Sequence, residues 1–232
     1  MKYILLLIIM LVVSTSCKEN KQNIAVDNGY TITLKNLKSW ANNRKARIIK
    51  VENRKRVVVD SIIVNDGGGV FKGDIKLSGK HYITFDNKSG VIEFILSNET
   101  IDIIVNNETP KLSIINNSPQ NNIITTYTNE SEYLRKYIST LKAKNAGFIK
   151  LKDTLSINKI KKSYDSITEV GINFDKTFIK NNPSKVFSAI ILERLTLSKT
   201  IKKSEAKLLF KELKNDAINS IAAKKLEPIL KD

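Results

Sequence analysis

The residues of this chain whose types and spacing suggest chemistry begin with a run of glycines. The stretch DSIIVNDGGGVFKG, residues 60–73, holds four of the nine glycines in the chain. Glycine-rich loops bind phosphates in nucleotide-binding proteins when lysine and serine or threonine follow at fixed positions. Asp74 and Ile75 occupy those positions after Gly68 and Gly73, and Lys72 replaces the third glycine of a dinucleotide motif. The stretch therefore excludes both motifs, and flanking apolar runs predict that NDGGG is a hairpin turn.

Other residue types offer little support for catalysis. His81 is the single histidine and lies at the start of a predicted strand, GKHYITF, a position more typical of a packed or surface residue than of a catalyst. Asp60 and Ser61 are neighbours in a predicted strand, so they point to opposite faces and do not form a nucleophile and base. The chain has one cysteine and no Asp-x-Asp-x-Asp-Gly run, so neither disulfide exchange nor a calcium loop is indicated. We expect no catalytic residue, metal or cofactor.

The N-terminus predicts export and a lipid anchor. Residues 1–16 combine a lysine, eleven apolar residues and small residues, as in a cleaved signal peptide. The small residues before Cys17 resemble the lipobox of bacterial lipoproteins, although Ser14 stands where leucine is usual. The resemblance implies that Cys17 is lipidated. Residues 17–28 are polar and without periodicity, which predicts a flexible tether, and Lys18-Glu19 resembles a signal for sorting to the outer membrane. The alternative is an ordinary signal peptide with a chance cysteine.

Positive charge is concentrated in one predicted hairpin. The chain carries a formal net charge of +16, and the segment RKARIIKVENRKR is its densest basic patch. The seven candidate polyanion contacts are Arg44, Lys45, Arg47, Lys50, Arg54, Lys55 and Arg56. Such a patch attracts phosphates, lipid head groups or other envelope polyanions; the alternative is a solvated hairpin face of a lysine-rich chain. Nucleic acid is disfavoured because no aromatic residues interleave with the basic ones.

The elements that position these residues fall into two regions. Residues 29–117 alternate apolar and polar residues in short runs separated by turn residues, which predicts an antiparallel β-sandwich of seven or eight strands. Trp40 lies between two of these strands and is expected either to seal one end of the sandwich or to anchor a partner. Residues 118–232 show helical periodicity, as at Tyr133, Tyr137 and Leu141, and predict four or five helices. The expected fold class is α+β.

Several of these segments together resemble a known family. The run DSIIVNDGGGVFKGDIKL resembles the central motif of the domain of unknown function 4369, which precedes a thioredoxin-like oxidoreductase domain in envelope lipoproteins. YTITLKNL is similar to its first strand, and FIKNNPSKVFSAIIL, residues 178–192, resembles the helical segment that follows. The motif residues, which the resemblance implies are structural, are Asp60, Ser61, Gly67, Gly68, Gly69, Phe71 and Gly73.

This resemblance transfers no catalytic motif. The sequence ends at Asp232 and contains no C-x-x-C, so we expect it to lack the redox activity of the family's fused members. The leading expectation is a non-enzymatic, lipid-anchored envelope protein that acts as a binding or docking module. One alternative is an accessory subunit of a separately encoded thioredoxin-like protein. Another is a hydrolase that uses dispersed carboxylates.

Overall fold

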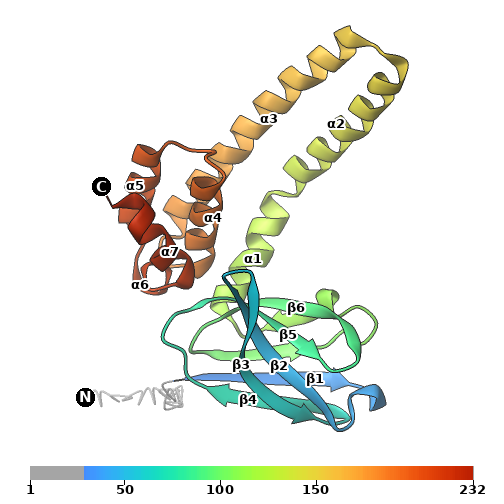
Figure 1. Ribbon diagram of the computed structural model, residues 1–232, viewed down its shortest axis with the longest axis vertical. Coiled ribbons are helices and arrows are strands. Elements are labelled where there is room, and N and C mark those ends of the chain that lie inside the picture. Colours follow the sequence, from blue (N-terminus) through green and yellow to red (C-terminus); the bar gives the residue numbers. More distant parts are fainter. Residues whose placement is uncertain (1–28, 232) are drawn as a thin grey trace, which may run out of the picture.

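The computed structural model describes residues 29–231, which form a β-sandwich followed by helices (Figure 1). The expected α+β class is confirmed. The predicted signal peptide, the lipidation of Cys17 and the tether lie outside the described residues. The strands end at residue 116 and the first long helix begins at Pro119, next to the boundary expected at residues 117 and 118.

Eight strands form two sheets of four. The strands are β1 (Tyr30–Leu37), β2 (Arg44–Glu52), β3 (Lys55–Val64), β4 (Gly67–Gly73), β5 (Gly79–Phe85), β6 (Lys88–Leu96), β7 (Thr100–Ile104) and β8 (Ile114–Asn116). One sheet has the order β4-β1-β7-β8 and the other β3-β2-β5-β6. The prediction of a wholly antiparallel sandwich is wrong for one pair, because β1 and β7 run parallel. Strands β5 and β6, which belong to the other sheet, come directly before β7 in the chain, so no hairpin sets the direction of β7.

The core of the sandwich lies between the two sheets. In β1 the alternating residues Tyr30, Ile32 and Leu34 are buried, and Phe71 of β4 is fully buried. The facing sheet adds Ile48, Ile83 and Phe94, among others. Strand alternation places one set of side chains on the inner face, which is why the period-two pattern of the sequence predicts these core positions.

Seven helices follow, where four or five were expected. They are α1 (Pro119–Glu130), α2 (Glu132–Leu151), α3 (Thr154–Asn181), α4 (Val186–Leu197), α5 (Lys203–Glu212), α6 (Asn215–Ile218) and α7 (Ile221–Leu230). Two of them escape periodicity analysis: α1 is mostly polar, and α6 has only four residues. Two short 3₁₀ helices, η1 (Ser39–Ala41) and η2 (Pro110–Leu112), lie within the sandwich region.

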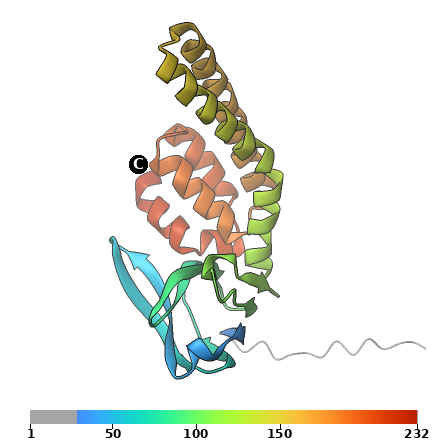
Figure 2. The same cartoon turned by 90° about the vertical axis from the view of Figure 1, so that its right-hand side faces the viewer.

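The helices form a compact group and a projecting hairpin. A second core joins the end of α3 to α4, α5, α6 and α7 through residues such as Ile179, Leu192 and Leu226. The antiparallel pair α2 and α3 extends away from both cores (Figures 1 and 2), and Leu134 and Leu141 are the only buried residues of α2. Within residues 29–231, no helix combines the length and apolar content needed to cross a membrane.

Polar contacts join the sandwich to the helices. The buried amide of Asn121, in α1, accepts a hydrogen bond from Ile95 N (2.8 Å) and donates one to Ile95 O (2.8 Å). Asn121 thus satisfies the free edge of β6 as a neighbouring strand would. On the other side, Ile221 N donates to Ser78 O at 2.9 Å. The junction therefore depends on specific hydrogen bonds as well as on apolar contact.

Candidate functional site

The glycine stretch is a packing device within the sandwich. Asn65 and Gly68 exchange two backbone hydrogen bonds of 3.2 Å, so Asp66 and Gly67 are the central residues of the turn between β3 and β4, and Gly67 has a φ of +94°. Gly68 lies within β4, where a Cβ would stand 2.1 Å from the carbonyl oxygen of Leu34 on β1. The prediction that all three glycines form the turn is therefore wrong. Gly68 and Gly69 belong to strand β4 and pair with β1. They are glycines because neighbouring backbone and side-chain atoms leave no room for a Cβ at either position.

The remaining motif residues link the two sheets. The Tyr30 hydroxyl, on β1, donates a hydrogen bond to Asp60 Oδ2 of β3 at 2.9 Å, and burial together with this carboxylate raises the pKa of Tyr30 well above its usual value. The ring of Tyr30 occupies the space that a Cβ of Gly73 would need, at 2.6 Å from the hydroxyl. Asp60 Oδ1 accepts from Ser61 N. These contacts close one edge of the sandwich and leave no nucleophile aligned with a base.

His81 and Trp40 are also used in packing. His81 is buried, lies beside Phe94 and has its Nδ1 at 2.9 Å from Gly79 O; burial lowers its pKa. The indole of Trp40 donates to Asn107 Oδ1 at 2.7 Å and meets the ring of Phe85 edge-on at 5.4 Å. Trp40 therefore seals one end of the sandwich, and neither residue is presented to a ligand.

The structure divides the seven predicted polyanion contacts into two groups. Arg47 forms an ion pair with Asp86 and lowers the pKa of that carboxyl group. Arg44 donates to the carbonyl oxygen of Trp40, and Lys50 pairs with Glu52 at 3.2 Å. These three side chains are engaged by the sandwich itself, so they are poorly placed to bind an external anion.

The other four basic side chains are not held in place in this way, although the charge of Lys45 contributes to lowering the pKa of Asp86. No ion pair or side-chain hydrogen bond among the described residues involves Lys45, Arg54, Lys55 or Arg56. Three of them form the tip of the β2–β3 hairpin, where Asn53 and Arg54 both have positive φ, 50° and 62°. This geometry is typical of a tight two-residue turn and is uncommon for arginine.

Exposed valines accompany these charges. Val51 pairs with Arg56, and Ile49 pairs with Val58, so all four side chains lie on the same face of the hairpin. Val51 is 49% exposed and Val58 is 55% exposed. The β2–β3 tip, defined as residues 51–58, thus offers free positive charge together with apolar surface. The sequence indicated the charge, but it did not separate free from engaged side chains.

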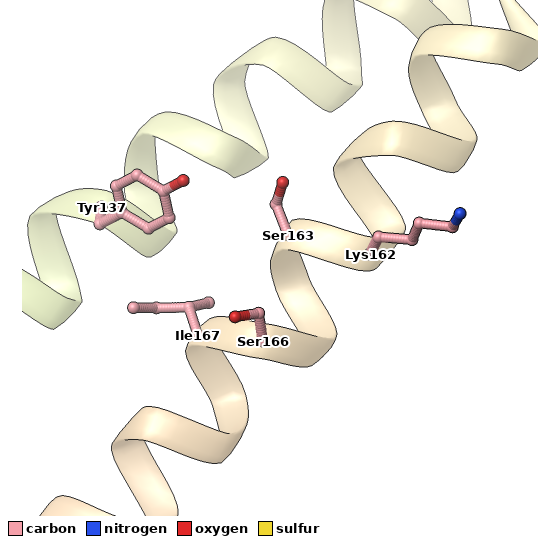
Figure 3. Close-up of a pocket in the computed structure, with 5 residues that line it drawn as sticks. All are labelled: Tyr137, Lys162, Ser163, Ser166 and Ile167. Carbon is pink, nitrogen blue, oxygen red and sulfur yellow. The ribbon is translucent and has the colours of Figure 1, made fainter.

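Two hollows on the described surface can be compared with the expected chemistry. The larger, of about 440 Å³, opens between α2 and α3 and is lined by Tyr137, Lys162, Ser163, Ser166 and Ile167 (Figure 3). Tyr137 approaches from α2, and the other four residues come from two adjacent turns of α3. This hollow contains no carboxylate, histidine or cysteine. The hollow is a shallow gap between the two packed helices of the hairpin.

The smaller hollow, of about 180 Å³, lies at the junction and contains two carboxylates, Glu99 and Asp216. Both are engaged: the Ser118 hydroxyl donates to Glu99, and Gln120 Nε2 donates to Asp216 at 3.0 Å. Burial raises the pKa of Glu99. Within residues 29–231 no three metal-ligating side chains of histidine, cysteine, aspartate or glutamate converge. The arrangement joins the two regions and holds no recognisable catalytic set.

Comparison with known families gives one match. The sequence profile of a domain of unknown function, DUF4369, matches residues 30–124. This range covers all eight strands and the first half of α1, whereas the predicted resemblance of residues 178–192 lies outside it. No curated protein and no solved structure matches the chain.

Proposed function

Since the chain carries a DUF4369 domain over residues 30–124, we propose that it is a non-enzymatic docking module of the bacterial cell envelope, held by a lipid on Cys17, whose β2–β3 tip binds an anionic partner. The partner is an acidic polymer of the envelope, such as a phosphorylated or sulfated glycan. No reaction is needed for this role. Its specificity rests on charge and on the shape of a rigid hairpin.

The observation that carries the proposal is the group of unpaired basic side chains at the tip. Arg54, Lys55 and Arg56 are exposed, whereas Arg44 and Arg47 nearby are bound within the sandwich. Arginine binds phosphate and carboxylate groups through two parallel hydrogen bonds. Val51 and Val58, exposed on the same face as Arg56, add apolar contact, which a purely solvated hairpin does not need.

Charge reversal at the tip tests the docking surface. Dextran sulfate serves as the probe, and its affinity is measured by fluorescence anisotropy for the variant Arg54→Glu, Lys55→Glu, Arg56→Glu. We expect the affinity to fall at least about tenfold, because three basic side chains that contact sulfate groups are removed. The dependence of the affinity on salt concentration should weaken as well. The variant should unfold close to the denaturant concentration of the parent, since these side chains make no ion pair or side-chain hydrogen bond within residues 29–231.

A matched control separates this surface from net charge. The variant Lys202→Glu, Lys211→Glu, Lys214→Glu changes the charge equally at three exposed lysines of the helical region. Equal losses of affinity in the two variants would show that only total charge matters and would contradict the proposal. The lipid anchor has its own test: metabolic labelling with a palmitate analogue should mark the protein, and Cys17→Ser should abolish the label.

A further inference from the structure

The net positive charge of the α2–α3 hairpin comes from its distal part. Residues 142–162, which surround the turn between the two helices, contain seven lysines and one aspartate. The remainder of the hairpin, residues 131–141 and 163–181, contains four basic and four acidic residues. The base of the hairpin is therefore neutral, and its far end is strongly positive. None of the seven lysines lies within ion-pair distance of a carboxylate among the described residues.

Exposed apolar side chains gather at the same end. Ile149 is 56% exposed, Leu151 is 76% exposed and Leu155 is 77% exposed. Leu151 ends α2, and Leu155 lies in the first turn of α3, so both flank the connection between the helices. We call residues 149–155 the hairpin tip. Large apolar side chains this exposed at an extremity are not explained by either hydrophobic core.

The tip is presented by a defined turn. Lys152 adopts a left-handed conformation with a φ of 55°, and the amides of Lys152 and Asp153 donate to carbonyl oxygens of the last turn of α2. The Asp153 side chain accepts from Ser156 N at 3.1 Å and so caps α3. Figures 1 and 2 show the hairpin projecting beyond the rest of the molecule, with the turn at its far end. The tip therefore reaches a surface that the cores do not touch.

We propose that the α2–α3 hairpin tip inserts into the head-group region of an anionic lipid membrane. Apolar side chains at an extremity enter the boundary between head groups and acyl chains, while surrounding lysines bind anionic lipids. Long lysine side chains reach head groups even when their backbone lies deeper or farther away. A docked protein surface would instead require a groove or a single apolar face, whereas Ile149, Leu151 and Leu155 surround the end of the hairpin from both helices.

This membrane contact differs from the proposed docking at the β2–β3 tip in its residues and its ligand. It also needs no lipid on Cys17, because the tip supplies both the apolar and the basic component. A weak, reversible attachment is expected, since few apolar side chains are available and single attachments of this kind are reversible. Binding should fall steeply with salt.

A local fluorescent reporter tests the proposal in the full chain. Cys17→Ser removes the single cysteine, and Thr154→Cys then places an environment-sensitive fluorophore at the tip. A second protein carries the fluorophore at Glu212→Cys, an exposed position on α5. With vesicles of phosphatidylglycerol we expect a blue shift from the tip label alone. With vesicles of phosphatidylcholine we expect neither label to shift at the same lipid concentration.

Two variants of the tip-labelled protein separate charge from apolar contact. Replacement of Lys150, Lys152, Lys159 and Lys161 by glutamine should raise the phosphatidylglycerol concentration needed for half of the shift by about a hundredfold or more. Leu151→Ser with Leu155→Ser should raise it by at least about tenfold. The matched control, Leu197→Ser with Leu208→Ser, changes two other exposed leucines and should leave it unchanged.

Four results would overturn the proposal. The first is an equal shift of the tip label with both kinds of vesicle, and the second is an equal shift of the tip and α5 labels. The third is a shift that grows with protein concentration in the absence of vesicles, which would assign the tip to contact between two copies of this chain. Retained binding in either tip variant would also contradict it.

Discussion

The sandwich and the α2–α3 hairpin use their apolar residues in different ways. In the sandwich, both sheets direct their large side chains into one core, and Ile32, Phe71 and Ile83 are fully buried. In the hairpin, two long helices share a narrow seam with Leu134, Leu141 and Ile160, while leucines at the far end face solvent. The sandwich is built for stability. The hairpin retains exposed residues that folding does not require, which makes it the better place to look for an interaction.

The β2–β3 tip repeats this contrast within the sandwich itself. Near the core, Arg44 and Arg47 are held by backbone and carboxylate groups, whereas Arg54 and Arg56 beyond the core make no ion pair or side-chain hydrogen bond within residues 29–231. In both regions, side chains close to a core are used in folding and side chains far from it remain free. The following predictions test whether the two regions respond to mutation as this comparison requires.

The largest contrast is expected from the same substitution in the two regions. Gly68→Ala places a Cβ 2.1 Å from the Leu34 carbonyl oxygen and should destabilise the sandwich by about 3 kcal/mol through backbone displacement. Gly171→Ala, within α3, has no atom within 4 Å of its new Cβ and should stabilise the helix by about 0.5–1 kcal/mol. Hydrogen exchange of β1 and α3 peptides measures each effect locally.

The opposite signs are the test of this comparison. If Gly68→Ala leaves the exchange of β1 unchanged, the close approach of β4 to β1 is not a constraint on the fold. If Gly171→Ala accelerates exchange in α3, that position is not the open helical site described above.

A smaller effect is expected at the junction. Asn121→Ala removes both hydrogen bonds to Ile95 and leaves the buried edge of β6 unsatisfied, at a cost of about 2 kcal/mol. Asn122→Ala is the matched control, because its exposed side chain makes no hydrogen bond within the described residues. Urea unfolding followed by circular dichroism measures both. Equal midpoints for the two variants would show that apolar contact alone holds the helices on the sandwich.

The smallest effect is expected from His81. Burial lowers the pKa of His81 below its ordinary value of 6.5, so the folded state favours the neutral ring. The unfolded chain therefore binds more protons as the pH falls through about 6.5, and the stability of the sandwich should decrease there. Above about pH 6.5 the burial of neutral His81 costs no stability through proton binding. His81→Gln should flatten the dependence of unfolding free energy on pH; parallel curves for parent and variant would contradict the assignment.

Much of the fold was predictable because its signals are local. Alternation in Tyr30, Ile32 and Leu34 predicts a strand with one buried face, and the helical spacing of Tyr133, Tyr137 and Leu141 predicts a helix where α2 lies. Two details were missed for a common reason. The parallel pairing of β1 with β7 and the position of Gly68 in a strand both depend on contacts with β1, which is distant in sequence.

The candidate sites show the same limit. The sequence marks Arg44–Arg56 as basic, but Asp86, which engages Arg47, is 39 residues away. Nothing in the spacing of the arginines indicates which one it binds. The hairpin tip was missed altogether, because Leu151 and Leu155 are exposed by their place at the far end of two helices, which hydrophobic periodicity does not reveal.

The sequence by itself determined the two-part α+β architecture, since hydrophobic periodicity and turn residues act between near neighbours. Tertiary structure alone decided which charged and apolar side chains stay free. That outcome depends on long-range packing, because the fold decides whether another group of the same chain lies close enough to bind a given side chain.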